Sequence, residues 1–209
     1  MDKQNYHGHA RYEILPYMPK KFSKVVDVGG SAGGTLSAIR QMAPHAITVC
    51  LDADEPSLQI ARTQGHQAIR CDLDREIPEV FQDSDVVLFL DILEHLVDPW
   101  TVLSTIVAKL RPGTNVIISL PNVRYWNVSL NLVLRGQWTL QDAGVLDRTH
   151  LRFFTRNSGA ALVSNGGLTL KASVSKVAPG LRFQLLNLMT LGVLRDFLSP
   201  QNIYVAVKA

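Results

Sequence analysis

Glycines and aspartates follow the first two strands that the sequence predicts. The apolar run at residues 25–28 passes directly into a segment with glycine at 29, 30, 33 and 34 and serine at 31. A turn without Cβ atoms lets the backbone approach a ligand, and the first amides of the following helix can bind it. Asp52 ends the next predicted strand, where its carboxylate can accept both hydroxyls of a ribose. The pattern indicates a site for a ligand that contains a nucleoside.

The glycine segment departs from the dinucleotide fingerprint. The pattern G-x-G-x-x-G, laid from Gly29 to Gly34, requires glycine where Ser31 stands. The chain also lacks a recognisable hydride-transfer constellation, so a nucleotide-dependent oxidoreductase is kept only as an alternative. Asp72 ends the third predicted strand, and it either faces the ligand or caps a turn.

An alternation of strands and helices must position these residues. Apolar runs predict strands at 25–28, 47–51, 67–71, 85–90, 115–120, 168–175 and 203–208. Helical patterns and their caps predict helices at 36–42, 55–64, 98–110 and 155–166. Such an alternation forces crossover connections, which place helices on both faces of a mainly parallel sheet. The fold class is therefore α/β and doubly wound.

Size and composition agree with one folded domain over residues 1–209. Of the 209 residues 46% are hydrophobic and 19% are charged, which is typical of a packed protein. The net charge of +3 is spread along the chain without a basic run, so we expect no nucleic-acid partner. No apolar run reaches the roughly 18 residues that would span a membrane. Cys50 and Cys71 are expected as free thiols in a cytoplasmic protein.

Four segments resemble, in order, the motifs of class I S-adenosylmethionine-dependent methyltransferases. They are residues 25–34, Cys71-Asp72-Leu73, Asp91-Ile92-Leu93-Glu94-His95-Leu96 and Leu110-Arg111-Pro112-Gly113. The resemblance implies a seven-stranded sheet with an antiparallel last strand, S-adenosylmethionine as cofactor and S-adenosylhomocysteine as product. Residues 121–124 and 144–155 also resemble a subset found beside glycosyltransferases in surface-polysaccharide gene clusters, which implies a sugar-type acceptor.

The family pattern implies a cofactor contact for ten residues of this chain. Asp27, Gly29, Gly30, Ser31 and Gly33 would surround the methionine part, Asp52 and Ala53 the ribose, Asp72 and Leu73 the adenine, and Asp91 the sulfonium.

The resemblance implies that the transferable methyl group, beside Asp91, points toward the acceptor. His95 and His150 are the candidate catalytic bases, because a hydroxyl or amine acceptor loses a proton during methyl transfer. Each of them could instead serve only the hydrogen bonding of the fold. We expect no metal site, since Asp91, Glu94 and His95 do not form a known ligand spacing and no Cys/His cluster is present.

An irregular insertion at about residues 122–150 is expected to cover the acceptor. Tyr125, Trp126, Asp147 and Arg148 are its candidate substrate-binding residues. The aromatic pair could instead pack the insertion onto the core, and the charged pair could tie a loop to the sheet.

An apolar helix is predicted at about residues 181–198. It could cover the core, form a homodimer interface or wall a lipid-linked acceptor, and we favour core cover or a homodimer. Taken together, the sequence predicts S-adenosylmethionine-dependent methyl transfer to oxygen or nitrogen of a small polar metabolite or a sugar-type acceptor. The non-enzymatic alternative is a scaffold that binds the cofactor and a partner.

Overall fold

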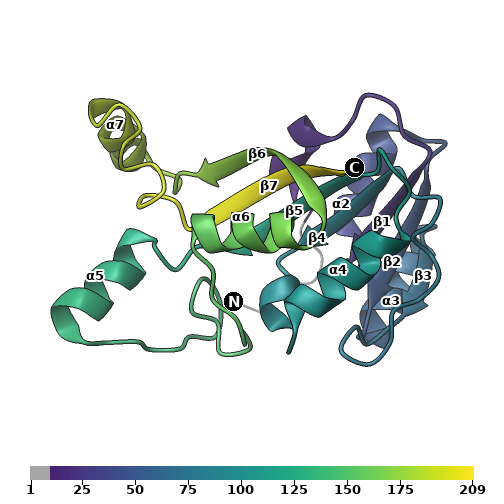
Figure 1. The fold of residues 1–209 in the computed structure, drawn as a ribbon, viewed down its shortest axis with the longest axis horizontal. Helices are drawn as coiled ribbons and strands as arrows, with labels where there is room; N and C mark the ends of the chain where they lie inside the picture. Colours follow the sequence, from purple (N-terminus) through teal and green to yellow (C-terminus); the bar gives the residue numbers. More distant parts are fainter. Residues whose placement is uncertain (1–9) are drawn as a thin grey trace.

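The computed structural model describes residues 10–209, in which seven strands form one sheet between helices (Figure 1). The strands are β1 (Lys24–Val28), β2 (Ile47–Asp52), β3 (Gln67–Arg70), β4 (Val86–Leu90), β5 (Asn115–Pro121), β6 (Leu168–Lys176) and β7 (Gln201–Lys208). The helices are η1 (Tyr12–Tyr17), α2 (Gly34–Met42), α3 (Glu55–Thr63), η2 (Leu93–His95), α4 (Pro99–Lys109), α5 (Trp126–Arg135), α6 (Arg156–Asn165) and α7 (Leu181–Met189).

The strand order is β3-β2-β1-β4-β5-β7-β6, and β7 is antiparallel to both of its neighbours. The pairs from β3 to β5 are parallel. The predicted fold class, including the antiparallel last strand, is confirmed. The chain reverses its direction across the sheet between β1 and β4, and doubly wound sheets bind ligands in the crevice at such a point.

Helices on both faces explain why the central strands are apolar throughout. Leu36 and Ile39 of α2 pack with Leu58 of α3 on one face, whereas α4 and α6 contribute side chains such as Ile106 and Leu162 to the other. Helices α3, α4 and α6 begin at residues whose side chains cap them. For example, the Asp54 side chain accepts a hydrogen bond of 3.0 Å from the Ser57 amide.

Two predictions for the acceptor side need correction. The insertion at 122–150 is not wholly irregular, because it contains α5. The apolar helix ends at Met189 instead of 198, and none of its residues is buried, so it does not cover the core. An apolar sequence predicts a contact face but does not say which surface it meets, and here the sheet is already covered by α6.

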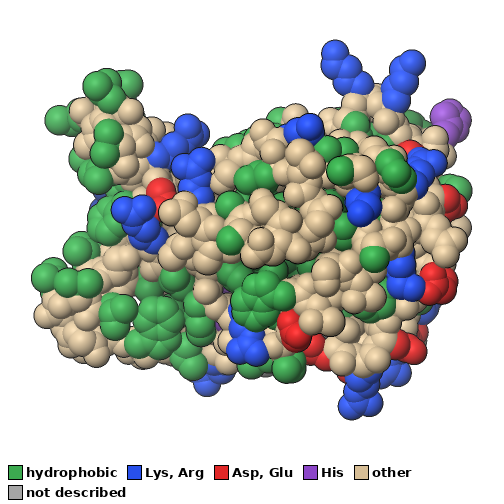
Figure 2. Space-filling model, in the orientation of Figure 1, with side chains coloured by type: hydrophobic (Ala, Val, Ile, Leu, Met, Phe, Trp, Pro, Cys, Tyr) green, Lys and Arg blue, Asp and Glu red, His purple; other side chains and the backbone are tan. Residues whose placement is uncertain are grey.

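Helices α5 and α7 lie at one end of the molecule, away from the rest of the sheet (Figure 1). Hydrophobic side chains gather over this end (Figure 2). The exposed apolar residues of the two helices are Leu130, Leu132, Val133, Leu134, Leu181, Leu185, Leu186, Leu188 and Met189. No helix within residues 10–209 has both the length and the hydropathy to cross a bilayer. The homodimer interface stays a prediction.

Candidate active site

A cavity of about 110 Å³ lies at the carboxyl ends of the central strands. Its lining residues are Gly29, Leu51, Asp52, Ala53, Cys71, Asp72, Leu73, Ile92 and Leu96. Five of them were predicted as cofactor residues, because parallel strands bring their carboxyl ends to one edge of the sheet. Four further lining residues were not predicted as cofactor contacts, namely Leu51, Cys71, Ile92 and Leu96. Each of them is next to a predicted residue or belongs to the same sequence motif, so its position in the sequence could have indicated it.

Three residues of the turn between β1 and α2 adopt left-handed backbone conformations. Gly29 and Gly33 have φ of +74° and +78°, and Ser31 has φ of +48°. A Cβ atom on Gly29 would lie 2.8 Å from the side chain of Ile92, so glycine is required there. The turn is also fastened to β2, since the Ser31 amide donates to the Asp52 carboxylate at 2.8 Å. This arrangement brings the ribose-binding candidate Asp52 beside the glycine turn.

Asp27 and Asp72 have different surroundings. The Asp27 carboxyl is buried, and burial together with the nearby Asp52 carboxylate raises its pKa to about 7, against a lowering by Arg11. Asp72 lines the cavity, but its side chain also pairs with Arg75 at 3.1 Å and accepts from the Asp74 amide. The turn-capping alternative for Asp72 therefore holds alongside its place in the cavity.

Asp91 is the meeting point of three distant segments. Its carboxylate forms an ion pair with Arg11 and accepts hydrogen bonds from Ser119 Oγ at 2.9 Å and from Gln201 Nε2 at 2.6 and 2.8 Å. Its φ is +55°, which is strained for a residue with a Cβ. Arg11 and Gln201 were not predicted as site residues, and no sequence signal marks them, because each lies 80 or more positions from Asp91.

The candidate bases lie together near Asp91. The ring centroids of His95 and His150 are 4.8 Å apart. The loop that carries His150 is fastened to η2, since the amides of Leu151 and Arg152 donate to the Glu94 carbonyl at 2.8 and 3.0 Å. Burial and the neighbouring His95 lower the pKa of His150. The Glu94 carboxyl is buried close to Asp91, and both effects raise its pKa well above the usual range.

The four candidate substrate residues are spread more widely. Asp147 lies near the histidines and accepts hydrogen bonds from the amide and hydroxyl of Thr149 at 2.8 and 2.6 Å. Arg148 is exposed and pairs with Asp142. Trp126 lies beside Tyr125 and packs against Phe183 of α7, with ring centroids 6.2 Å apart. The structure thus brings only Asp147 next to the candidate bases.

The fold and the strand-end site define a Rossmann-like domain that accommodates a nucleoside-containing cofactor. A family model described as "Methyltransferase domain" matches residues 4–173. The chain belongs to this family, and S-adenosylmethionine is the cofactor that membership implies. The oxidoreductase alternative is thereby set aside. The residues that line the cavity fit the chemistry of the group, since the Asp52 carboxylate offers an acceptor for the ribose hydroxyls and Leu73 and Ile92 offer apolar surface.

The curated relatives include the ubiquinone biosynthesis O-methyltransferase of Vibrio vulnificus, 30% identical over 47% of this chain and 44% of that protein. The enzyme of the same name from Acinetobacter baumannii is 28% identical over 71% of this chain and 64% of the relative. This chain thus spans about half to two thirds of the length of these relatives.

Solved structures share the fold at low sequence identity. A chain of the complex between the Haloferax volcanii Trm112 methyltransferase activator and a methyltransferase has a TM-score of 0.67 and 18% identity, covering 98% of this chain and 91% of its own. An S-adenosylmethionine-dependent methyltransferase from Mesorhizobium loti has a TM-score of 0.65 and 14% identity, with coverages of 94% and 96%.

Proposed function

We propose that this domain transfers the methyl group of S-adenosylmethionine to a hydroxyl oxygen of a small polar acceptor. The observation that carries the proposal is the strand-end cavity, in which the glycine turn meets Asp52 and Asp72 in a chain of this family. The curated relatives named O-methyltransferases favour oxygen over nitrogen. A sugar-type acceptor and a nitrogen acceptor remain the alternatives.

The glycine turn and the strand-end acids would hold the cofactor. Asp52 would accept the ribose hydroxyls through the lone pairs that its bonds to the Ser31 and Asp54 amides leave free. Leu73 and Ile92 supply apolar walls of the cavity. When bound, the cofactor supplies an electrophilic methyl group on a sulfonium. The protein then contributes mainly by aligning the acceptor oxygen with that methyl group and excluding water.

The histidine pair would activate the acceptor. An alcohol is a weak nucleophile until its proton leaves, so a base within reach raises the rate. His95 and His150 face one another beside the loop that follows β4, with Asp147 close to both. We place the acceptor hydroxyl between this pair and the end of β4. Asp147 would hold the acceptor through its remaining lone pairs, and Tyr125, Trp126 and Arg148 would line the outer part of its path.

Calorimetric titration tests the cofactor assignment. S-adenosylmethionine should bind and NADH should not. Asp52→Ala should weaken the binding by about 1–3 kcal/mol, because a hydrogen-bond acceptor is lost. Asp83→Asn is the matched control, since Asp83 is a solvent-exposed acid that pairs with Lys24 at the amino end of the sheet. Its affinity should equal that of the unmodified protein.

Transfer of a radiolabelled methyl group to a panel of phenols, sugars and amines tests the acceptor class. Labelling of phenols or sugars supports oxygen transfer, and labelling of amines alone refutes it. Tight cofactor binding without any transfer would favour the scaffold alternative. Absence of S-adenosylmethionine binding, or full binding by Asp52→Ala, would overturn the placement of the cofactor.

A further inference from the structure

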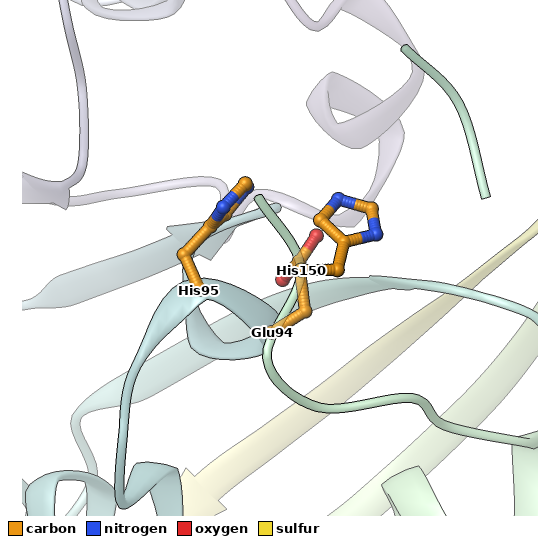
Figure 3. Close-up of side chains that lie close together, drawn as sticks. All are labelled: Glu94, His95 and His150. Carbon is orange, nitrogen blue, oxygen red and sulfur yellow. The ribbon is translucent and has the colours of Figure 1, made fainter. Parts of the chain in front are cut away.

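Three side chains with metal-binding atoms converge beside the candidate acceptor position. Glu94 and His95 come from η2, and His150 comes from a loop 55 residues further along the chain. One donor atom from each lies within 4.8 Å of those of the other two. In Figure 3 the Glu94 carboxylate lies between the two imidazole rings in the view. The spacing of Glu94 and His95 alone does not predict a metal site, because the third donor comes from a distant loop.

The Glu94 side chain is an acid without a partner. The residue is 1% exposed, and neither carboxylate oxygen has a hydrogen-bond partner among the described residues. A buried charge is costly unless it is paired, hydrogen-bonded or bound to a metal ion. The nearby Asp91 adds negative charge, and its own carboxylate is already occupied by Arg11 and Gln201. A cation next to Glu94 would give this buried carboxylate the partner that it lacks.

Both histidines are oriented by backbone carbonyls. The Nδ1 atom of His95 lies 3.3 Å from the Thr149 carbonyl oxygen, and the Nδ1 atom of His150 lies 3.2 Å from that of Val145. A carbonyl oxygen only accepts, so each Nδ1 must carry the proton and donate it. Each Nε2 then keeps its lone pair. Metal-binding histidines are typically fixed in this way, with the second ring nitrogen donating to a carbonyl or carboxylate.

We propose that Glu94, His95 and His150 bind one divalent transition-metal ion. Two imidazoles and one carboxylate suit ions such as Zn²⁺, Mn²⁺ or Co²⁺ and leave coordination positions open. Metal–ligand distances of about 2.0–2.2 Å place the donor atoms of a tetrahedral site roughly 3.3–3.6 Å apart. The donors, which lie within 4.8 Å of one another, therefore have to close by up to about an ångström, which rotations of the side chains can provide.

The role of the ion rests on the proposed oxygen transfer. An open position would take the acceptor hydroxyl and lower its pKa, so that its proton passes to solvent. The oxygen lone pair then forms the bond to the methyl carbon, while the carbon–sulfur bond breaks and its electron pair stays on sulfur. In this arrangement the histidines act through the ion instead of removing the proton themselves. The acceptor class is one that presents an oxygen donor to a metal, such as a phenol or a vicinal diol.

Titration with Co²⁺ tests the site without any turnover. The protein should be untagged and should carry His7→Asn and His9→Asn, because these two sequence positions are also imidazoles. We expect one equivalent of Co²⁺ to bind with visible d–d absorption of a low-coordinate site, and Zn²⁺ to displace it. Glu94→Gln and His150→Asn should each weaken binding at least tenfold. His45→Asn is the control, since this exposed histidine lies far along the chain from the cluster.

Thermal unfolding checks that each variant is folded. Glu94→Gln is isosteric and replaces one buried polar group that lacks a hydrogen-bond partner with another, so it should fold about as well as the unmodified chain. Folded Glu94→Gln and His150→Asn proteins that bind Co²⁺ as the parent does would overturn the site. Co²⁺ binding that depends on both residues supports the site even if no acceptor is methylated, in which case only the proposed function fails. Full methyl transfer after chelation, with no Co²⁺ binding, overturns the site and leaves the histidines as bases.

Discussion

Asp27 should make cofactor binding depend on pH. Its carboxyl is 2% exposed at the end of β1, and burial followed by the neighbouring Asp52 raises its pKa to about 7. Near neutral pH this group is therefore partly protonated. The cofactor carries a sulfonium and an ammonium group, so its methionine part should bind better when Asp27 is ionised. Affinity should rise as the pH increases.

The size of the pH effect on cofactor affinity follows from the raised pKa of Asp27. If only the ionised form binds well, the affinity changes by up to tenfold per pH unit below the pKa, or about 1.4 kcal/mol. From pH 5.5 to 7.5 this gives roughly a 25-fold increase. The stability of the unliganded protein should change in the opposite direction. The folded state keeps a proton that the unfolded state has lost, so stability falls between about pH 4 and 7, by up to about 4 kcal/mol.

Calorimetry at pH 5.5, 6.5 and 7.5, in two buffers of different ionisation enthalpy, measures both the affinity and the proton released on binding. Asp27→Asn should abolish the dependence of cofactor affinity on pH and the proton release on binding. It should also remove the loss of stability at higher pH. Asp83→Asn should retain the slope of the unmodified protein. An Asp27→Asn protein with an unchanged pH slope would refute the reasoning, because the titrating group would then lie elsewhere.

Two substitutions test the glycine turn and the apolar end. Gly29→Ala should cost about 2–5 kcal/mol in urea unfolding and weaken cofactor binding, because about 1–2 kcal/mol of backbone strain adds to a Cβ contact with Ile92 at 2.8 Å. Gly136→Ala, also at positive φ but with nothing within 4 Å, should cost only about 1–2 kcal/mol. Equal costs would argue against the Ile92 contact. Leu188→Ser with Met189→Ser, at positions 69% and 80% exposed, should change stability by no more than about 0.5 kcal/mol per site. If the predicted homodimer uses α7, this double variant should elute as a monomer in size-exclusion chromatography, and an unchanged dimer would exclude that face.

The fold was predictable because local signals agree along most of the chain. Apolar runs of strand length alternate with capped helices, and the handedness of crossovers leaves few ways to arrange them. The parallel arrangement of the strands also predicts which residues lie on the cofactor side of the site. Gly29, Asp52 and Asp72 are far apart in sequence but follow parallel strands, so the sheet itself brings them to one edge.

The acceptor side was harder to predict, because it depends on which distant side chains meet. An apolar stretch predicted a helix from Leu181 but not that the helix would remain exposed. The pairing of His95 with His150 depends on how the loop after α5 folds back onto η2, and the Glu94 carbonyl that fastens this loop has no sequence signature. Long-range polar contacts of this kind follow from the completed tertiary structure.

Asp91 joins the two sides of the site. Its left-handed backbone conformation is unfavourable for an aspartate, and such strain persists only where the surroundings enforce it. Here Arg11, Ser119 and Gln201 hold the carboxylate. The same turn continues directly into η2, so the direction in which Asp91 leaves β4 decides where Glu94 and His95 project. Arg11 and Gln201 of β7 therefore help to position the candidate acceptor groups through Asp91.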